Sequence, residues 1–212
     1  MQLTRRARPD ERGVTLIEVL VAISILVIIM VPLGNALISF YRNSDETNGR
    51  LSESHDAQIA AAYFTQDVQS LGRRDWGATG FGLQQSIEVD VASNGGLFPC
   101  APGTPDAAVR FLWDDTTAGV VRVSYVVQTV GGERQLHRIT CIGSSAVSSD
   151  LVLAHNLDPS AAVGPPACAT SCVGGGGAPA VPQWVKLTLI LKSPATTGAG
   201  LTVTLVGQRR QT

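Results

Sequence analysis

A long apolar run near the N-terminus constrains this chain more than any other feature of its sequence. Between Val14 and Tyr41 the only charged residue is Glu18. A helix of about 20 apolar residues crosses the roughly 30 Å hydrocarbon core of a bilayer. Residues 14–41 are therefore long enough to form a transmembrane helix, and the rest of the chain must fold as a domain beside a membrane anchor.

The charges around this run predict its orientation. Four arginines precede it, and no Lys or Arg follows until Arg42. The positive-inside rule then places the N-terminus in the cytoplasm and exports everything after Arg42. The basic residues of the leader are Arg5, Arg6, Arg8 and Arg12.

Two ordinary interpretations of the run leave Glu18 unexplained. A secretory signal peptide would need a small-residue cleavage site after the apolar core, and residues 32–36 are a poor candidate for it. An anchor that is never cleaved accounts for the hydrophobicity equally well. Neither needs a carboxylate, which costs about 2.5–3.5 kcal/mol at mid-membrane on insertion scales and normally has a partner there.

The residues around Glu18 carry a resemblance. Arg12-Gly13-Val14-Thr15-Leu16-Ile17-Glu18 resembles the type IV prepilin signature, in which a Gly precedes an apolar residue, Thr-Leu-Ile-Glu and a long apolar helix. The resemblance implies that a prepilin peptidase removes residues 1–13 as a leader by cutting after Gly13, and N-methylates Val14. Val14 departs from the Phe or Met that is usual at this position, a change that the family tolerates.

The resemblance also gives Glu18 a role. A free amine created at Val14 lies one helical turn away and can pair with the Glu18 of a neighbouring subunit in a helix bundle, which would set the register between protomers. Pro32 resembles the proline of pilin helices and predicts a kink or local melting there. The implied partners are a prepilin peptidase, other pilin or pseudopilin subunits, an inner-membrane assembly platform and membrane lipid.

Beyond the anchor, residues 42–72 are predicted to continue the helix in an amphipathic form. Ala57, Ala61, Phe64, Val68 and Leu71 follow the 4-3-4-3 spacing of one helix face, which predicts a core-facing stripe. Gly72 is a stop signal.

Residues 73–212 are predicted to form an exported, β-rich head with a loop-rich region at 143–183. Period-two alternation and β-branched residues mark the strands, and Gly131-Gly132 predicts a hairpin. The fold class is α+β: a long N-terminal helix packed on a mainly antiparallel sheet, as in pilins. The predicted strands are 87–91, 109–113, 120–130, 135–142, 151–154, 184–192 and 201–207.

A second resemblance concerns the head. Tyr125, then Leu136 and Arg138 across the hairpin, resemble the Tyr and Leu-x-Arg strands of the minor pilin family that includes pseudopilin J. Phe64, Asp67 and Val68 resemble the Phe-x-x-Asp-aliphatic run of that family's helix. The alternative is structural: Tyr125 and Leu136 belong to the core and Arg138 is a solvated strand residue.

Four cysteines, Cys100, Cys141, Cys168 and Cys172, lie in the predicted exported part, where disulfides are permitted. Proximity in the sequence favours Cys168 with Cys172, leaving Cys100 with Cys141. Free thiols and a zinc site are the alternatives, although zinc sites usually contain two close pairs and this chain has one.

The motifs associated with catalysis, metal or cofactor binding give no match, so we expect no enzyme activity, no metal and no cofactor. Sixteen basic against seventeen acidic residues give a formal charge of −1, which does not favour nucleic acid as the main partner. The sequence predicts a minor pilin or pseudopilin that enters or primes a filament: a type IV pilus, a competence filament or a type II secretion pseudopilus. The alternative is an anchored head that binds a surface, a ligand or DNA.

Overall fold

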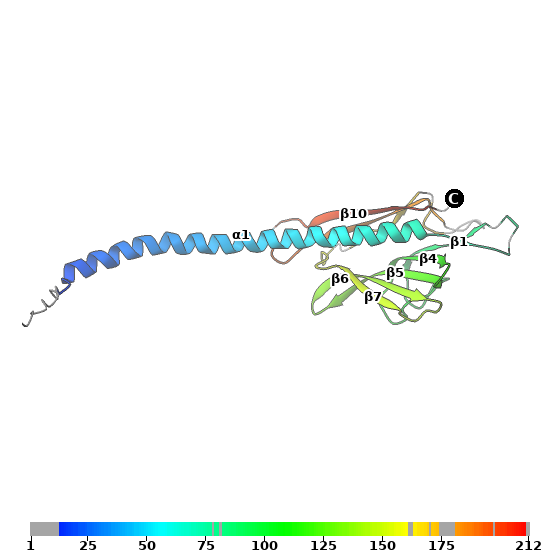
Figure 1. Cartoon of the computed structure of the whole chain (residues 1–212), viewed down its shortest axis with the longest axis horizontal. Helices are drawn as coiled ribbons and strands as arrows, with labels where there is room; N and C mark the ends of the chain where they lie inside the picture. Colours follow the sequence, from blue (N-terminus) through cyan, green and yellow to red (C-terminus); the bar gives the residue numbers. More distant parts are fainter. Residues whose placement is uncertain are drawn as a thin grey trace, which may run out of the picture. The chain divides into compact units, whose positions relative to one another are not determined.

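One helix, α1, dominates the N-terminal third of the structure, which is a computed structural model (Figure 1). It runs from Leu16 to Ser70 over 55 residues. It ends where the Leu71 amide bonds the Val68 carbonyl in a tighter turn. Gly72 then adopts a φ of 125°, a conformation that side-chain-bearing residues rarely take. The predicted stop signal is confirmed.

Pro32 lies inside α1, and the helix continues through it without interruption. The structure therefore shows no local melting at this point. The missing backbone donor of a proline still removes one helical hydrogen bond, so a kink at Pro32 stays a prediction.

The structure describes residues 13–77, 79–80, 82–160, 163–169, 171–173, 181–196 and 198–210. It divides into two units, residues 1–44 and residues 45–212. The second is called the head unit below. Most of the predicted leader, residues 1–12, and parts of the predicted loop region 143–183 lie outside the described residues.

The larger sheet of the head unit has five antiparallel strands in the order β3-β4-β5-β6-β7. All five strands were predicted, with boundaries that differ by a few residues. The predicted hairpin is confirmed: Val130 pairs with Glu133 across Gly131 and Gly132, both at positive φ, as a two-residue turn requires. The strands are β3 (Ile87–Val91), β4 (Ala107–Asp115), β5 (Gly119–Val130), β6 (Glu133–Ile142) and β7 (Ser149–Ala154).

A separate sheet is formed by the C-terminal strands in the order β10-β9-β8. The two long strands, β9 (Trp184–Leu191) and β10 (Leu201–Gln208), were predicted, whereas β8 (Ala167–Cys168) was not. A two-stranded ribbon, β1 (Arg73–Arg74) with β2 (Leu83–Gln84), was not predicted either. Two-residue strands are too short for alternation to reveal them.

The head-unit part of α1 is packed against both larger sheets, and Figure 1 shows it running between β10 and the strands of the five-stranded sheet. Phe64 makes edge-to-face contacts with Phe111 and Tyr125 of that sheet. On the other side, Gly207 of β10 approaches so closely that a Cβ there would lie 2.3 Å from the Cβ of Val68. The predicted helical stripe is confirmed as core, with Ala57 and Ala61 half-buried at its margin.

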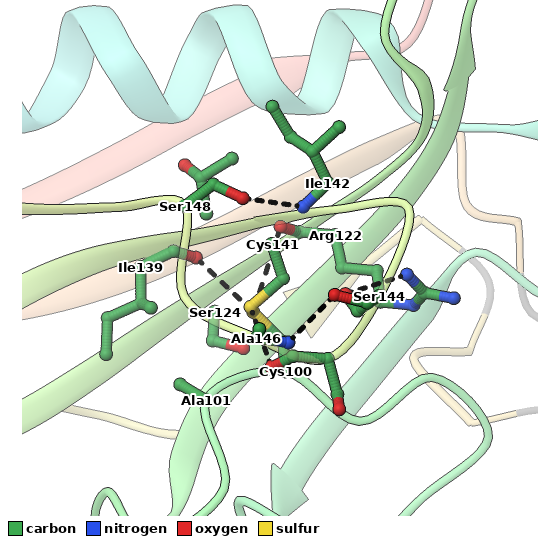
Figure 2. The surroundings of a disulfide bond; sticks show 12 residues. Cys100, Ala101, Arg122, Ser124, Ile139, Cys141, Ile142, Ser144, Ala146 and Ser148 are labelled. Carbon is green, nitrogen blue, oxygen red and sulfur yellow. Dashed lines mark hydrogen bonds between the residues drawn. A yellow bond between two sulfur atoms is a disulfide. The ribbon is translucent and has the colours of Figure 1, made fainter.

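The face of the five-stranded sheet that points away from α1 is covered by the loop at 92–106. Alternate residues of β5 divide between the faces: Val123 and Tyr125 point into the main core, whereas Val126 packs in a second cluster under the loop. Cys100 of the loop forms a disulfide with Cys141 of β6 (Figure 2).

Arg110 anchors the same loop from beneath and is fully buried. Its guanidinium donates to Glu88 (3.2 Å), to Ser124 (3.0 Å) and to backbone carbonyls of the loop, among them Gly95 (3.0 Å). Burial lowers the pKa of Arg110, and the charge and hydrogen bond of Glu88 oppose that shift. Arg110 and the disulfide therefore hold the loop from two sides.

The second disulfide joins Cys168 and Cys172, and no free cysteine is present among the described residues. Both pairings expected from proximity are confirmed. The zinc and free-thiol alternatives are wrong, because the sulfur of each of the four cysteines is bonded to the sulfur of another.

We expect the two disulfides to contribute unequally to stability. A disulfide stabilises mainly by restricting the unfolded chain, more for longer loops, and typically by about 2–4 kcal/mol. Cys100 and Cys141 are 41 residues apart, whereas Cys168 and Cys172 are 4 apart. The paired substitution Cys100→Ser/Cys141→Ser should lower the free energy of unfolding in denaturant titrations more than Cys168→Ser/Cys172→Ser. Equal losses would contradict this account.

Candidate functional site

The N-terminal site begins with the turn that starts α1. Thr15 precedes the first helical residue, and its hydroxyl accepts a hydrogen bond from the Glu18 amide at 3.4 Å. Its carbonyl accepts from the Val19 amide at 3.2 Å. Ser or Thr at the N-cap with Glu three residues later is a capping box. The sequence signature contains Thr15, but its role as the helix cap was not predicted, although the Thr-x-x-Glu spacing was the signal for it.

Val14 therefore lies just before the helix, and Glu18 lies on its first turn. Val14 is 69% exposed, and Glu18 is also exposed. Among residues 13–44, the Glu18 carboxylate has no basic partner in its own chain. Since a carboxylate near the positive end of a helix dipole is stabilised, Glu18 can both support the start of α1 and remain open to a cation from outside.

Gly13 lies before the helix in open surroundings. A Cβ added there would meet nothing within 4 Å. The chain's own fold therefore does not require glycine at this position, so a requirement for glycine would have to come from an enzyme that acts on it.

The rest of the anchor segment exposes its apolar side chains on every side. Every residue from Leu16 to Tyr41 is exposed, and α1 is the one helix among the described residues that is long and apolar enough to cross a membrane. Such a continuous apolar surface needs lipid or other apolar helices around it. The segment is consistent with a single-pass anchor.

A second site, a buried triad of Asp67, Tyr125 and Arg138, joins α1 to the sheet. The Tyr125 hydroxyl donates to Asp67 Oδ2 at 2.7 Å. Arg138 donates a hydrogen bond to each oxygen of the same carboxylate, from Nε to Oδ2 at 2.7 Å and from Nη2 to Oδ1 at 2.6 Å. Tyr125 and Arg138 are direct cross-strand partners in β5 and β6, so the sheet presents both donors to one carboxylate.

The charges of the triad support one another. Asp67 is 1% exposed, and a buried carboxylate is tolerated when it is paired and hydrogen-bonded. Burial raises the pKa of Tyr125 well above its ordinary value, and Asp67 raises it further, so the hydroxyl stays a donor. Burial alone lowers the pKa of Arg138, but the hydrogen bonds and charge of Asp67 outweigh it and raise the pKa.

The triad brings together the residues of both head motifs that resemble the pseudopilin J family. Phe64 and Val68 flank it in the core, and Arg138 also lies over the ring of Tyr63 at 5.3 Å. The structural alternative is confirmed for Tyr125 and Leu136, which are fully buried. It is wrong for Arg138, which is not a solvated strand residue, because its side chain is 15% exposed and bound to Asp67.

Two further acids of α1 hold loops of the head unit. Glu53 accepts from the Ser193 amide (2.6 Å) and the Thr196 hydroxyl (3.0 Å). Asp56 accepts from the His155 amide at 2.7 Å. Neither contact was predicted from the sequence. Their spacing could have revealed them, because residues 53, 56, 60, 64 and 67 follow one another at steps of three or four residues and so lie on one face of the helix.

No group of three or more metal-ligating side chains is present in the described part of the chain. His137 and His155 each contact one carboxylate instead, Asp150 at 2.8 Å and Asp56 at 3.2 Å respectively. The His137–Asp150 pair links β6 to β7, and the His155–Asp56 pair links the residue after β7 to α1.

Comparison with known proteins agrees with the N-terminal site. The family model of the prokaryotic N-terminal methylation motif matches residues 8–34. This range includes Gly13, Val14, Glu18 and Pro32, and it ends before the head unit. No curated protein and no solved structure matches the chain.

Proposed function

From the premise that the chain is a type IV prepilin-like protein, we propose that it is a minor pilin or pseudopilin. A prepilin peptidase cuts after Gly13 and methylates Val14, and the product joins or primes a filament. The observation that carries this proposal is the methylation motif placed on a capped, fully exposed apolar helix whose Glu18 has no basic partner among the described residues.

The physics of assembly follows from the exposed anchor segment. In lipid, apolar helices associate by van der Waals packing and by polar contacts between them. The new Val14 amine of one subunit would neutralise the Glu18 of another and remove the cost of a lone carboxylate in an apolar bundle. That pair fixes the axial position of each subunit, and the heads project around the bundle.

The triad supports the narrower proposal of a pseudopilin J-like minor subunit. Asp67, Tyr125 and Arg138 come from the two motifs that resemble that family, and they meet in one buried hydrogen-bonded site. A rigid junction between helix and head suits a subunit whose head must keep its position on a helical filament.

The proposal is tested by the N-terminal mass of the protein recovered from its native membrane. We expect the chain to start at N-methyl-Val14. A chain that starts at Met1 would make the protein a plain anchored domain, and one that starts near Ala36 would make it a secreted protein. Either result would overturn the filament role.

Glu18→Ala is expected to leave membrane insertion and cleavage largely intact and to reduce incorporation into filaments strongly. The register pair is lost, whereas the cleavage site is unchanged. Incorporation is measured as the fraction of processed protein in sheared filaments.

Two controls separate the charge of Glu18 from its place in the capping box. Glu18→Gln keeps a capping side chain at this position, so it should fail to incorporate if the ion pair matters and behave normally if only capping matters. Glu46→Ala removes a half-buried acid of the same helix and should incorporate normally. Normal incorporation of Glu18→Ala would refute the register pair.

A groove in the head unit favours the second candidate function, an anchored module that binds a surface or a ligand. Its volume is about 420 Å³, and it lies between the β5–β6 turn and the loops at 156–160 and 192–196. Substitution of Lys192 and Pro194 in the groove should abolish attachment but not filaments if this function holds. Loss of filaments would favour a purely structural head.

A further inference from the structure

The two disulfides of the head unit differ in their exposure to solvent. Cys100 and Cys141 are 1% and 0% exposed, and both belong to the same buried cluster. Cys168 and Cys172 are half-buried, and Val173, the next residue along the chain, is 61% exposed. Solutes can therefore approach the second disulfide in the folded protein, whereas the first is covered.

Backbone oxygens form a further barrier around the covered disulfide (Figure 2). Cys100 Sγ lies 3.9 Å from the Arg122 carbonyl oxygen and 3.8 Å from that of Ile139. Cys141 Sγ lies 3.4 Å from the Ser145 carbonyl oxygen. Thiol–disulfide exchange begins when a thiolate, which is an anion, attacks one of the two sulfurs. The partial negative charges of three carbonyl oxygens oppose that approach.

The half-buried disulfide lies at the edge of the C-terminal sheet. Its Cys172 sulfur lies 3.6 Å from the carbonyl oxygen of Pro166. Cys168 ends β8, the outermost strand in the order β10-β9-β8, and both residues of β8 pair with β9. The Ala169 amide adds a bond to the Trp184 carbonyl at 3.1 Å. The backbone that this disulfide braces is a short edge strand, so its reduction leaves the long strands of both sheets paired.

We propose that Cys168–Cys172 is a site of thiol–disulfide exchange, which a dithiol reduces in the folded protein while Cys100–Cys141 stays oxidised. Structural disulfides of secreted proteins resist reduction, whereas exposed ones are the labile, regulatory or catalytic ones. The reductant is a dithiol, either a small molecule or the active site of a protein oxidoreductase. The proposal goes beyond the filament role and does not depend on it, because it concerns the chemistry of the head unit.

The exchange takes place in two steps that balance. Cys168 packs against the main core and Cys172 does not, so we expect a thiolate of the dithiol to attack Cys172 Sγ. The bond between the two cysteines breaks, and Cys168 leaves as a thiolate that takes a proton from water. The second thiol of the reductant then attacks the mixed disulfide and releases Cys172 as a thiol. The protein gains two electrons and two protons, and the reductant becomes a disulfide.

Reduction should change the edge of the sheet without a loss of the fold. The two cysteines are 4 residues apart, so their bond restricts the unfolded chain less than the bond between cysteines that are 41 apart. Once it opens, β8 loses the brace that closes the chain after it. The Ala169 amide should then exchange its proton with solvent faster, because the least braced elements open most easily.

The test is time-resolved alkylation of the full chain, purified in detergent. The protein is treated with dithiothreitol under native conditions, quenched at intervals with iodoacetamide and mapped by peptide mass spectrometry. We expect Cys168 and Cys172 to be alkylated at least about tenfold faster than Cys100 and Cys141, which corresponds to about 1.4 kcal/mol in the free energy of opening. Cys100–Cys141 is the control within the same molecule, and a sample unfolded in guanidinium should show all four cysteines alkylated.

Two further measurements follow the partly reduced protein. Its Ala169 amide should exchange faster, and its thermal midpoint should stay close to that of the oxidised protein. A thioredoxin-type protein dithiol in place of dithiothreitol distinguishes the reductants. Reduction by both supports a site that a protein oxidoreductase reaches, and reduction by dithiothreitol alone supports a site for small thiols.

Three results would overturn the exchange site: equal rates for the two disulfides, reduction of Cys168–Cys172 only at denaturant concentrations that unfold the head unit, or unfolding of the head unit when this disulfide is reduced. The variant Cys168→Ser/Cys172→Ser checks the assignment. It should show no alkylation under native conditions over the same period.

Discussion

Gly13→Val is expected to leave the whole population of the protein uncleaved and absent from filaments. A peptidase that cuts after residue 13 must fit that residue beside the scissile bond, and only a minimal side chain is expected to fit. The chain itself sets no such limit, because a Cβ at Gly13 would meet nothing within 4 Å. The measurement is the N-terminal mass of the membrane fraction, with filament recovery alongside.

The open surroundings of Gly13 make this substitution a clean test. The head unit should fold normally in the variant, which its disulfide content and thermal unfolding would verify. Gly34→Val is the matched control, because an added Cβ at that glycine of α1 also meets nothing within 4 Å and the position is far from the cleavage site. Normal cleavage of Gly13→Val would show that the motif is not used by a peptidase of this kind.

Asp67→Ala is expected to destabilise the head unit by about 3–5 kcal/mol, the cost of breaking a buried ion pair by removing one partner. Arg138 would keep a charge in a site with 15% exposure and no carboxylate, and Tyr125 would lose the acceptor of its buried hydroxyl. Most single domains have only about 5–15 kcal/mol of stability. The variant should therefore unfold at a much lower denaturant concentration.

Graded controls divide this effect among the three side chains. Tyr125→Phe removes one hydrogen bond but leaves the ion pair, so a loss of about 1–3 kcal/mol is expected, since the Asp67 oxygen keeps its bonds to Arg138. Gln66→Ala, the exposed neighbour on α1, should change stability by less than about 0.5 kcal/mol. If Asp67→Ala lowers the free energy of unfolding no more than Tyr125→Phe does, the Asp67 carboxylate does not hold α1 to the sheet.

Such a loss would also affect function through the junction of helix and head. A loosened triad lets the head move relative to the residues of α1 that it covers. Asp67→Ala should then be cleaved normally at Gly13, because the leader is remote in sequence, yet accumulate poorly. Gly13→Val should therefore block cleavage without destabilising the head unit, whereas Asp67→Ala should destabilise the head unit without blocking cleavage.

The sequence by itself determined the features that depend on short-range pattern. The length of the apolar run and Gly72 determined the extent of α1. Period-two alternation located the seven longer strands, and Gly131-Gly132 located their tightest turn. These signals are local, because a helix or strand repeats its own periodicity and a turn depends on the residues that form it.

Only the tertiary structure decided which polar residues of those elements become buried and paired. Asp67 and Arg138 are 71 residues apart, and Asp56 and His155 are 99 apart. The division of the strands into two sheets around α1 and the loop at 92–106 that covers the second face are likewise long-range. Each depends on the register and packing of whole elements, and a period of two or of 3.6 residues says which face is apolar but not what that face will meet.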